Sequence, residues 1–257
     1  MGWLERFRRA AEPRLDPMDE ALRAAKAGDF AAALAIWEPL ARAGNARAQN
    51  NIAACFSGGY GIEENPELAA KWLKLSAAQG DPVGQRNLAT LHFRGEGVAQ
   101  DEAEAMRLYR LAADQGDATA QDMYSWMLAD NEDYEGALAY ARRAAAQGVA
   151  ASMTRIGNLL HNALGVERDA AAAAEWWRKA ALLGDADGQA MLGAAHITGA
   201  GTTRDPVAAL AWLLRARDGG SKLAQNFVPA ATAALTAEER EAARERAARP
   251  LAEEGGA

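Results

Sequence analysis

Cysteine, β-branched residues and long apolar runs are all scarce in this sequence. The single cysteine, Cys55, cannot form a disulfide within the chain, so nothing indicates an oxidising compartment. No apolar run approaches the roughly 20 residues that a membrane-spanning helix requires. The first residues also lack the apolar segment of a secretory signal peptide. We therefore expect a cytoplasmic protein.

A surplus of positive charge is missing as well. The chain has 28 Lys and Arg residues against 35 Asp and Glu residues, which gives a net charge of -7, and the basic residues are dispersed. Proteins that bind nucleic acid usually present clustered basic residues. The sequence therefore predicts no nucleic-acid partner.

Alanine dominates the hydrophobic half of the sequence. It has the highest intrinsic helix propensity, and the scarcity of Val, Ile and Phe disfavours sheets. The composition therefore predicts an all-α protein.

Glycines recur at a nearly constant interval. Six of them end alanine-rich runs at spacings of 36, 36, 32, 36 and 36 residues: Gly44, Gly80, Gly116, Gly148, Gly184 and Gly220. An interval of this size is typical of stacked helical repeats. We expect units starting near residues 16, 45, 81, 117, 149, 185 and 221, each holding a first helix (A helix) and a second helix (B helix).

Equivalent positions, numbered from 1 at the start of each unit, hold similar residues. Position 9 is small: Ala53, Ala89, Ser125, Gly157 and Gly193. Position 17, in the loop of the four long units, is glycine: Gly61, Gly97, Gly165 and Gly201. Position 28, with a four-residue deletion in the fourth unit, is mostly aromatic: Trp72, Leu108, Tyr140, Trp176 and Trp212. We expect the small residues to let helices approach closely and the aromatic residues to fill the gap between neighbouring units.

Capping residues indicate where the helices begin. Asp81 precedes Pro82, and Asn65 precedes Pro66, so each pair places an N-cap oxygen before a proline at the first helical position. Thr236-x-x-Glu239 is a capping box that opens a charged helix ending near residue 248.

Residues 88–101 followed by 105–116 resemble the Sel1-like repeat, a relative of the tetratricopeptide repeat with a longer loop between its helices. The resemblance extends over residues 16–235. The short turns at residues 28–30 and 131–137 are instead similar to an ordinary tetratricopeptide turn. The family resemblance implies a right-handed α/α superhelix, a solenoid that acts as an adaptor for other proteins.

We expect three parts in the chain. Residues 1–15 form a short N-terminal helix, with Trp3, Leu4 and Phe7 on one side, that caps the array. Residues 16–235 form the Sel1-like solenoid. Residues 236–257 form a C-terminal capping helix and a frayed tail from Pro250, in which Glu253 and Glu254 are solvated.

Helical geometry indicates which side of each A helix is open to a partner. Positions 5, 8, 9 and 12 cluster on one side and are expected to pack, whereas positions 6, 10 and 13 point roughly the opposite way. The predicted groove binds another protein or an extended peptide and comprises Asn50, Arg86, Thr90, Phe93, Asp122, Trp126, Thr154, Asn158 and His161. Trp126 has the size and amphipathic character of an interface anchor. The alternative is that it packs into the kink left by the shortened fourth loop.

Residues with reactive side chains form no recognisable catalytic arrangement. His92, His161 and His196 lie in different units without metal-ligand spacing. Cys55 shares its unit with no histidine, which favours a structural thiol that is partly buried. The loop glycines follow helices, and no Gly-Lys-Ser/Thr segment follows them, so they are not phosphate loops. The sequence therefore predicts no enzyme, no catalytic residue, no cofactor and no metal.

The leading hypothesis is a non-enzymatic adaptor or scaffold in bacterial signalling or complex assembly. Two other functions stay open. The first is a penicillin-type small-ligand binder or a β-lactamase-like enzyme, since some cysteine-rich relatives of the Sel1-like family are linked to penicillin binding and β-lactamase activity. This chain, however, lacks paired cysteines and a Ser-x-x-Lys motif. The second is contact with an anionic membrane through residues 1–12, where Arg6, Arg8 and Arg9 alternate with the apolar side chains. We favour the capping role for that segment over membrane contact.

Overall fold

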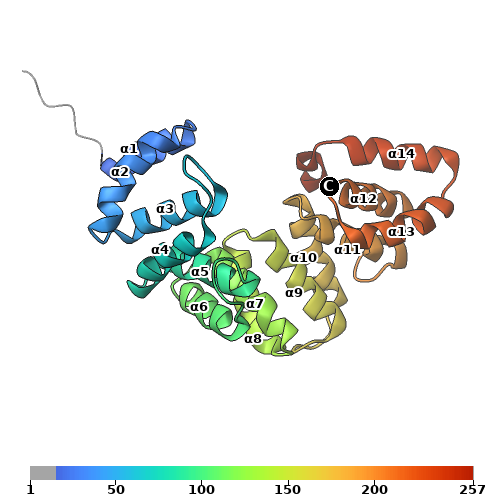
Figure 1. Cartoon of the computed structure of the whole chain (residues 1–257). Coiled ribbons are helices and arrows are strands. Elements are labelled where there is room, and N and C mark those ends of the chain that lie inside the picture. Colours follow the sequence, from blue (N-terminus) through green and yellow to red (C-terminus); the bar gives the residue numbers. More distant parts are fainter. Residues whose placement is uncertain (1–15, 257) are drawn as a thin grey trace, which may run out of the picture. The chain divides into compact units, whose positions relative to one another are not determined.

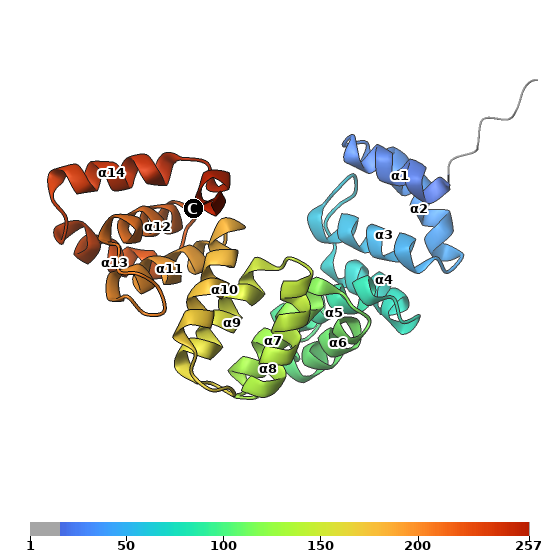
Figure 2. The same ribbon diagram turned by 180° about the vertical axis from the view of Figure 1, so that it is seen from behind.

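The computed structural model describes residues 16–256, and every regular element in that range is helical (Figures 1 and 2). The chain divides into two compact units, Met1–Gln115 and Gly116–Ala257. The predicted N-terminal cap, with Trp3, Leu4 and Phe7, lies outside the described residues. The all-α prediction is confirmed.

The first unit consists of three helix hairpins. Their helices are α1 (Pro17–Lys26), α2 (Phe30–Arg42), α3 (Ala46–Gly58), α4 (Pro66–Ala78), α5 (Pro82–Arg94) and α6 (Glu102–Asp114). Each A helix packs against its own B helix, and each B helix packs against the next A helix. The core is therefore shared between neighbouring hairpins, as expected for repeats that cannot bury an apolar face alone.

The second unit repeats this packing and adds a different end. Its hairpins are α7 (Ala118–Asp130) with α8 (Tyr134–Ala146), α9 (Ala150–Asn162) with α10 (Ala170–Leu182), and α11 (Ala186–Thr198) with α12 (Pro206–Asp218). Three further elements follow: α13 (Lys222–Ala233), α14 (Ala237–Ala248) and the 3-10 helix η2 (Leu251–Gly256).

The predicted caps begin the helices as expected. The Asp81 side chain accepts a hydrogen bond from the Gly84 amide at 2.6 Å, and Asn65 accepts one from the Leu68 amide at 2.9 Å. Thr236 forms a complete capping box at the start of α14. These side chains satisfy backbone N–H groups that have no partner within the helix.

The glycine at position 17 lets each long loop touch the preceding hairpin. A Cβ on Gly97 would lie 2.2 Å from the carbonyl oxygen of Pro66, at the start of the preceding B helix. A Cβ on Gly201 would lie 1.9 Å from the corresponding oxygen of Ala170. The loop therefore packs on backbone atoms and leaves no room for a side chain.

Position 9 also brings helices together as predicted. A Cβ on Gly157 would lie 2.4 Å from Nε1 of Trp177, which is 1% exposed. Trp177 occupies position 29, and position 29 is buried in all five of the repeats that start at residues 45, 81, 117, 149 and 185. These residues are Leu73, Tyr109, Ala141, Trp177 and Leu213. Position 28 is buried in two of these repeats, at Leu108 and Trp212, and half-buried in the other three, so position 29 is the more consistently buried of the two positions.

Two of the aromatic residues at position 28 lie at the edge of the core. Tyr140 and Trp176 are only half-buried, and a cation one turn further along covers each ring. The Lys179 ammonium lies 4.4 Å from the Trp176 ring centroid, and the Arg143 guanidinium lies 4.8 Å from that of Tyr140. A cation over an aromatic face is stabilising, and it shields a ring that the core does not cover.

Position 5 is polar, against the expectation of an apolar packing column. Its glutamines are nevertheless buried: Gln49, Gln85, Gln121 and Gln189. Gln49 donates to the carbonyl oxygen of Ala41 at 3.0 Å and accepts from Gln79 at 2.8 Å. The column therefore joins consecutive hairpins by hydrogen bonds, and a buried amide is acceptable because it has partners.

The structure differs from the expected frayed, solvated tail. Residues Leu251–Gly256 form η2, and the Glu254 side chain is only 8% exposed. Glu254 is held by Arg215 and Arg246, so the acidic residue expected in solvent belongs to an ion-pair cluster.

Candidate functional site

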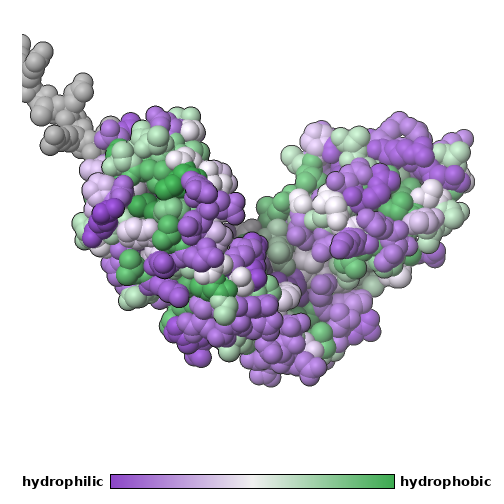
Figure 3. Space-filling view, viewed as in Figure 1, coloured by the Kyte–Doolittle hydropathy of each residue, from purple (hydrophilic) through white to green (hydrophobic). Residues whose placement is uncertain are grey.

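Exposed apolar side chains mark candidate binding surfaces. Hydrophobic residues appear as separate patches among hydrophilic ones (Figure 3). Within residues 16–256, the large apolar side chains that remain exposed are Tyr60, Ile62, Leu75, Leu111, Trp126, Leu183, Leu223 and Phe227. Among these, only Trp126 belongs to the predicted groove.

Three of the predicted groove residues in the first compact unit, Asn50, Arg86 and Thr90, belong to one hydrogen-bonded group. The side-chain amide of Asn87 donates to Oδ1 of Asn50 at 2.8 Å and accepts from Arg86 Nε at 3.2 Å. Sequence reasoning missed Asn87. Its place at position 7, next to the predicted position 6, was the available signal. These bonds fix the amide and guanidinium groups in one arrangement on α3 and α5.

Thr90 is held by the second helix of its own hairpin. Its hydroxyl lies 2.9 Å from the Tyr109 hydroxyl, and it also donates to the Arg86 carbonyl oxygen. Burial raises the pKa of the Tyr109 hydroxyl above its ordinary value, although the bond to Thr90 opposes this. The pair therefore stays uncharged at neutral pH and acts as a fixed polar contact.

A cavity of about 350 Å³ lies beside this group in the first unit. It is lined by Ala54, Ser57, Gly58, Tyr60, Leu73, Asn87, Thr90, Leu91, Arg94 and Glu96. Thr90 lines this cavity, whereas Asn50, Arg86 and Phe93 do not. Tyr60, which is 50% exposed, stacks on Phe30 at 5.1 Å, so the loop supplies part of the wall.

Asp122, in the second compact unit of the chain, forms a salt bridge with Arg155. Its Oδ1 accepts from Arg155 at 2.7 Å and from the Ser152 hydroxyl at 2.5 Å. The side chains of Asp122 and Arg155 are each 16% exposed. Asp122 thus positions Arg155, which was not among the predicted groove residues. Arg155 occupies position 7 of its repeat, where the other repeats have Asn or Met.

Thr154 and Asn158 have structural roles on the same face. Thr154 is only 6% exposed and donates to Asp185 at 2.6 Å. Asn158 accepts from the buried Trp177 indole N–H at 3.0 Å. The His161 ring lies 5.3 Å from that of Trp177. Asn158 still lines two cavities, so it can serve packing and recognition together.

Trp126 lines both of those cavities and is 40% exposed. One cavity, of about 260 Å³, is lined by Trp126, Ala151, Thr154, Arg155, Asn158, Asp185 and Asp187. The other, of about 330 Å³, is lined by Trp126, Ala129, Asp130, Tyr134, Arg155, Asn158, Leu159 and Leu164. We call these residues the Trp126 face. The shortened fourth loop does not bury the indole.

The charge of the Trp126 face is negative. Arg155 is matched by Asp122, which leaves the carboxylates of Asp130, Asp185 and Asp187 in excess. Asp185 is partly occupied as the N-cap of α11, and Asp187 accepts from Ser221 at 2.6 Å. The face therefore combines an aromatic surface with acidic groups of fixed orientation.

The reactive side chains stay apart. Within residues 16–256, no group of three or more His, Cys, Asp or Glu residues is arranged to hold a metal ion. His196 Nδ1 lies 2.9 Å from the Thr203 carbonyl oxygen, a contact within its own loop. Cys55 is 2% exposed, more buried than expected, and burial raises the pKa of its thiol. In the same range, no helix is both long and apolar enough to span a membrane.

Comparison with known proteins identifies the repeats. The Sel1 repeat family model matches residues 46–81, 82–117, 130–149, 150–185 and 186–221, more than half of the chain. Four of these segments begin within one residue of the predicted starts at 45, 81, 149 and 185, and the fifth, 130–149, covers only the second part of the unit predicted to start near 117. The family prediction is therefore confirmed. No curated protein matches the sequence.

Two crystal structures are similar over most of the chain. One is a protective antigen present in uropathogenic Escherichia coli strains that displays an SLR fold, with 30% identity and a TM-score of 0.84. The match covers 90% of this chain and 51% of that one, so this chain spans about half of the antigen's length. The other is a Sel1 repeat protein from Oxalobacter formigenes, with 25% identity, a TM-score of 0.82, and coverage of 91% and 97%.

Proposed function

The chain belongs to the Sel1 repeat family, whose members generally mediate protein–protein interactions, and we propose that it is a scaffold that holds a partner protein through the Trp126 face. Its role is complex assembly, and the bound element is an extended segment of the partner. The observation that supports this proposal most strongly is the 40% exposed indole of Trp126, which lines two cavities. Interface energy is commonly concentrated in such aromatic anchors.

Rigid surroundings favour binding at this face. Asp122 holds Arg155, and Trp177 holds Asn158, so the polar groups beside the indole are already ordered. A partner that docks there loses little free energy to ordering the scaffold. Thr154 supports the face through Asp185 and is not a direct contact.

The chemistry of the Trp126 face indicates what the partner segment contains. An apolar side chain fits against Leu159 and Leu164 on one side of the indole. A Lys or Arg side chain fits on the other side, where it meets Asp187 and the ring face. The bound segment is therefore basic and apolar, which complements a chain with a net charge of -7.

The scaffold role does not require catalysis. Sel1 repeat proteins are generally non-enzymatic scaffolds. The Trp126 face offers orientation and charge but no nucleophile paired with a base. We therefore assign it to binding alone.

A pull-down from native lysate with three baits tests the proposal. The baits are the wild-type chain, Trp126→Ala, and Leu183→Ala as a matched control. Leu183 is 58% exposed in the same unit and lines neither cavity of the Trp126 face. Circular dichroism confirms that all three are folded. We expect a partner that the wild type and the control retain and that Trp126→Ala loses.

Two results would contradict the proposal. Equal retention by all three baits would place the partner elsewhere on the chain. If the retained protein is acidic rather than basic at its contact segment, the assignment of partner chemistry is wrong.

A further inference from the structure

Helix α13 lacks the partner helix that covers every earlier A helix. Ser221 is the N-cap of α13 and occupies position 1 of its repeat, as Asp185 does before α11. Helix α13 is therefore the A helix of a further repeat. In the five hairpins from α3 to α12, the A helix packs extensively against the B helix that follows it. Helix α14 follows α13 but packs across α12 instead, and α12 lies between the two in both views (Figures 1 and 2).

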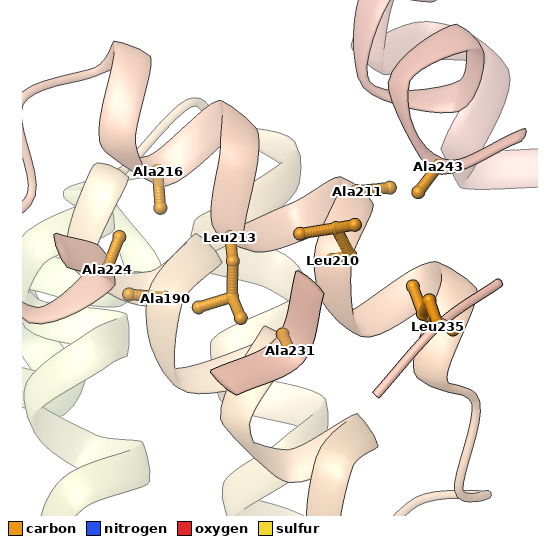
Figure 4. Close-up of a cluster of buried hydrophobic side chains, with 9 residues drawn as sticks. All are labelled: Ala190, Leu210, Ala211, Leu213, Ala216, Ala224, Ala231, Leu235 and Ala243. Atoms are coloured by element: carbon orange, nitrogen blue, oxygen red, sulfur yellow. The ribbon is translucent and has the colours of Figure 1, made fainter. Parts of the chain in front are cut away.

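The side chains explain why α14 leaves the repeat pattern. Ala243 of α14 points toward Ala211, whereas Ala224 and Ala231 of α13 lie on the other side of α12, near Leu213 (Figure 4). Arg215 of α12 donates to the carbonyl oxygens of residues 246, 247 and 249 and so holds the C-terminal end of α14. Helix α14 is thus fixed on α12, and the place of a B helix against α13 stays open.

A cavity of about 470 Å³ results between α12, α13 and α14. It is lined by Leu210, Leu214, Arg217, Asp218, Val228, Thr232, Arg240, Arg244, Ala247 and Ala248. Leu214, Val228 and Ala247 are partly buried and pack against the core beneath, so the floor is apolar. Val228 and Thr232 occupy positions 8 and 12, on the side of an A helix that packs in the earlier units.

Arginines surround this apolar floor. Arg217, Arg240 and Arg244 line the cavity with a single carboxylate, Asp218, in a chain whose net charge is negative. Arg217 pairs with Asp218 at 2.7 Å and Arg244 with Glu241 at 3.0 Å, both at exposed positions. Exposed pairs of this kind stabilise by about 1 kcal/mol or less, so a ligand carboxylate can replace them.

We propose that this cavity is a second docking site, and that its occupant is a short acidic amphipathic helix from a partner protein. Its apolar side packs on Leu214 and Val228, where a B helix would otherwise lie. Its carboxylates meet Arg217, Arg240 and Arg244. The repeat register specifies a helix as the occupant, and the arginines specify its charge. The site is separate from the Trp126 face, which selects a basic segment.

Selection from a displayed peptide library tests the proposal on the full chain. The library holds peptides of about 16 residues with leucine at i, i+3, i+4 and i+7, and with charged and polar residues randomised elsewhere. One target is the wild-type chain, and the other is the double variant Arg217→Glu/Arg244→Glu. A control double variant, Arg142→Glu/Arg178→Glu, changes the net charge equally at residues that do not line the cavity.

We expect Asp and Glu to be enriched with the wild type and the control, and Lys and Arg with Arg217→Glu/Arg244→Glu. The best wild-type peptide, measured by fluorescence anisotropy, should lose about tenfold or more in affinity for that variant. Ala248→Trp fills the cavity from its exposed rim and should abolish binding while the helical circular dichroism persists. Trp126→Ala should leave binding unchanged.

Three results would overturn the proposal. The first is selection of peptides with no charge preference, and the second is a preference unaffected by the arginine reversal. The third is a library without any enriched helix together with self-association of the chain that Arg217→Glu/Arg244→Glu abolishes. In that case the occupant is a second copy of this chain.

Discussion

Arg215 and Glu254 form an ion pair in which the two side chains are each 8% exposed and the N–O distance is 3.1 Å. Glu254 also binds Arg246, at 2.8 Å, and Arg215 lies 4.8 Å from the Trp212 ring centroid. The pair joins α12 to η2, while the remaining guanidinium hydrogens bind the end of α14. One side chain therefore attaches both terminal elements to the last complete hairpin.

Arg215→Met should destabilise the second unit by about 3 kcal/mol. The change leaves Glu254 without one partner and three carbonyl oxygens without a donor, and breaking a buried pair is costly. Urea unfolding measures the loss. Arg217→Met, on the exposed side of the same helix, is the control and should change stability by about 0.5 kcal/mol or less. Similar losses in both variants would mean that the C-terminal elements do not depend on Arg215.

Stability should depend on the ionisation of Glu254 in acid. The hydrogen bond from Arg246, and then the bond from Arg215, lower the pKa of Glu254 below its ordinary value. A group with a lowered pKa in the folded state stabilises fully above its unfolded pKa of about 4.3, and this contribution is lost as the pH falls through the folded pKa. The stability difference between wild type and Glu254→Gln should therefore be largest at pH 7 and shrink below about pH 4. A difference that is constant with pH would contradict this assignment.

Two glycines of one loop should differ sharply in their tolerance of alanine. Gly95 and Gly97 both have positive φ, 71° and 66°. In another repeat, Ala163 occupies the position equivalent to Gly95 with a φ of 56°, so an alanine is tolerated there. Gly95→Ala should therefore lower the free energy of unfolding by about 1 kcal/mol. A Cβ on Gly97 would meet the Pro66 carbonyl oxygen at 2.2 Å, so Gly97→Ala should cost about 3 kcal/mol or more. Thermal unfolding of both variants gives the comparison, and equal shifts would rule out the close approach.

The sequence was sufficient for the repeats because each turn and cap is encoded by a few neighbouring residues. Asp81, Asn65 and Gly97 act through local backbone geometry, so their spacing predicted the hairpins and their boundaries. The shortened loop before Tyr134 was equally visible. Local signals of this kind do not depend on what packs against them.

Features that depend on neighbouring hairpins could not be predicted in the same way. The indole of Trp177 and that of Trp176 differ by one position, and only the packed structure shows which is buried. Asn158 was predicted as a groove residue, but its amide also holds Trp177. The path of α14 depends on Arg215, which is one arginine among many in the sequence. Whether Trp126 binds a partner stays a prediction.

Cys55 should be unreactive in the folded chain. It is 2% exposed, and burial raises the pKa of its thiol, so little thiolate is available at neutral pH. Ellman's reagent should therefore react slowly in buffer and quickly in urea, where the first unit is unfolded. Fast labelling in buffer would show that α3 opens readily or that the thiol is accessible.

The buried glutamine column offers a test of whether hydrogen bonds or volume dominate between hairpins. Gln49 is 4% exposed and binds Ala41 and Gln79, whereas Met153 occupies the same position of another unit at 8% exposure. Gln49→Met keeps the volume and loses the hydrogen bonds, so it should cost about 1 kcal/mol. Gln49→Ala loses both and should cost about 2 to 3 kcal/mol, because it also leaves a cavity beside the Ala41 carbonyl oxygen. Urea unfolding compares the two variants. Equal costs would mean that the hydrogen bonds alone hold these hairpins together, and that Met153 is tolerated only because its own unit has other contacts.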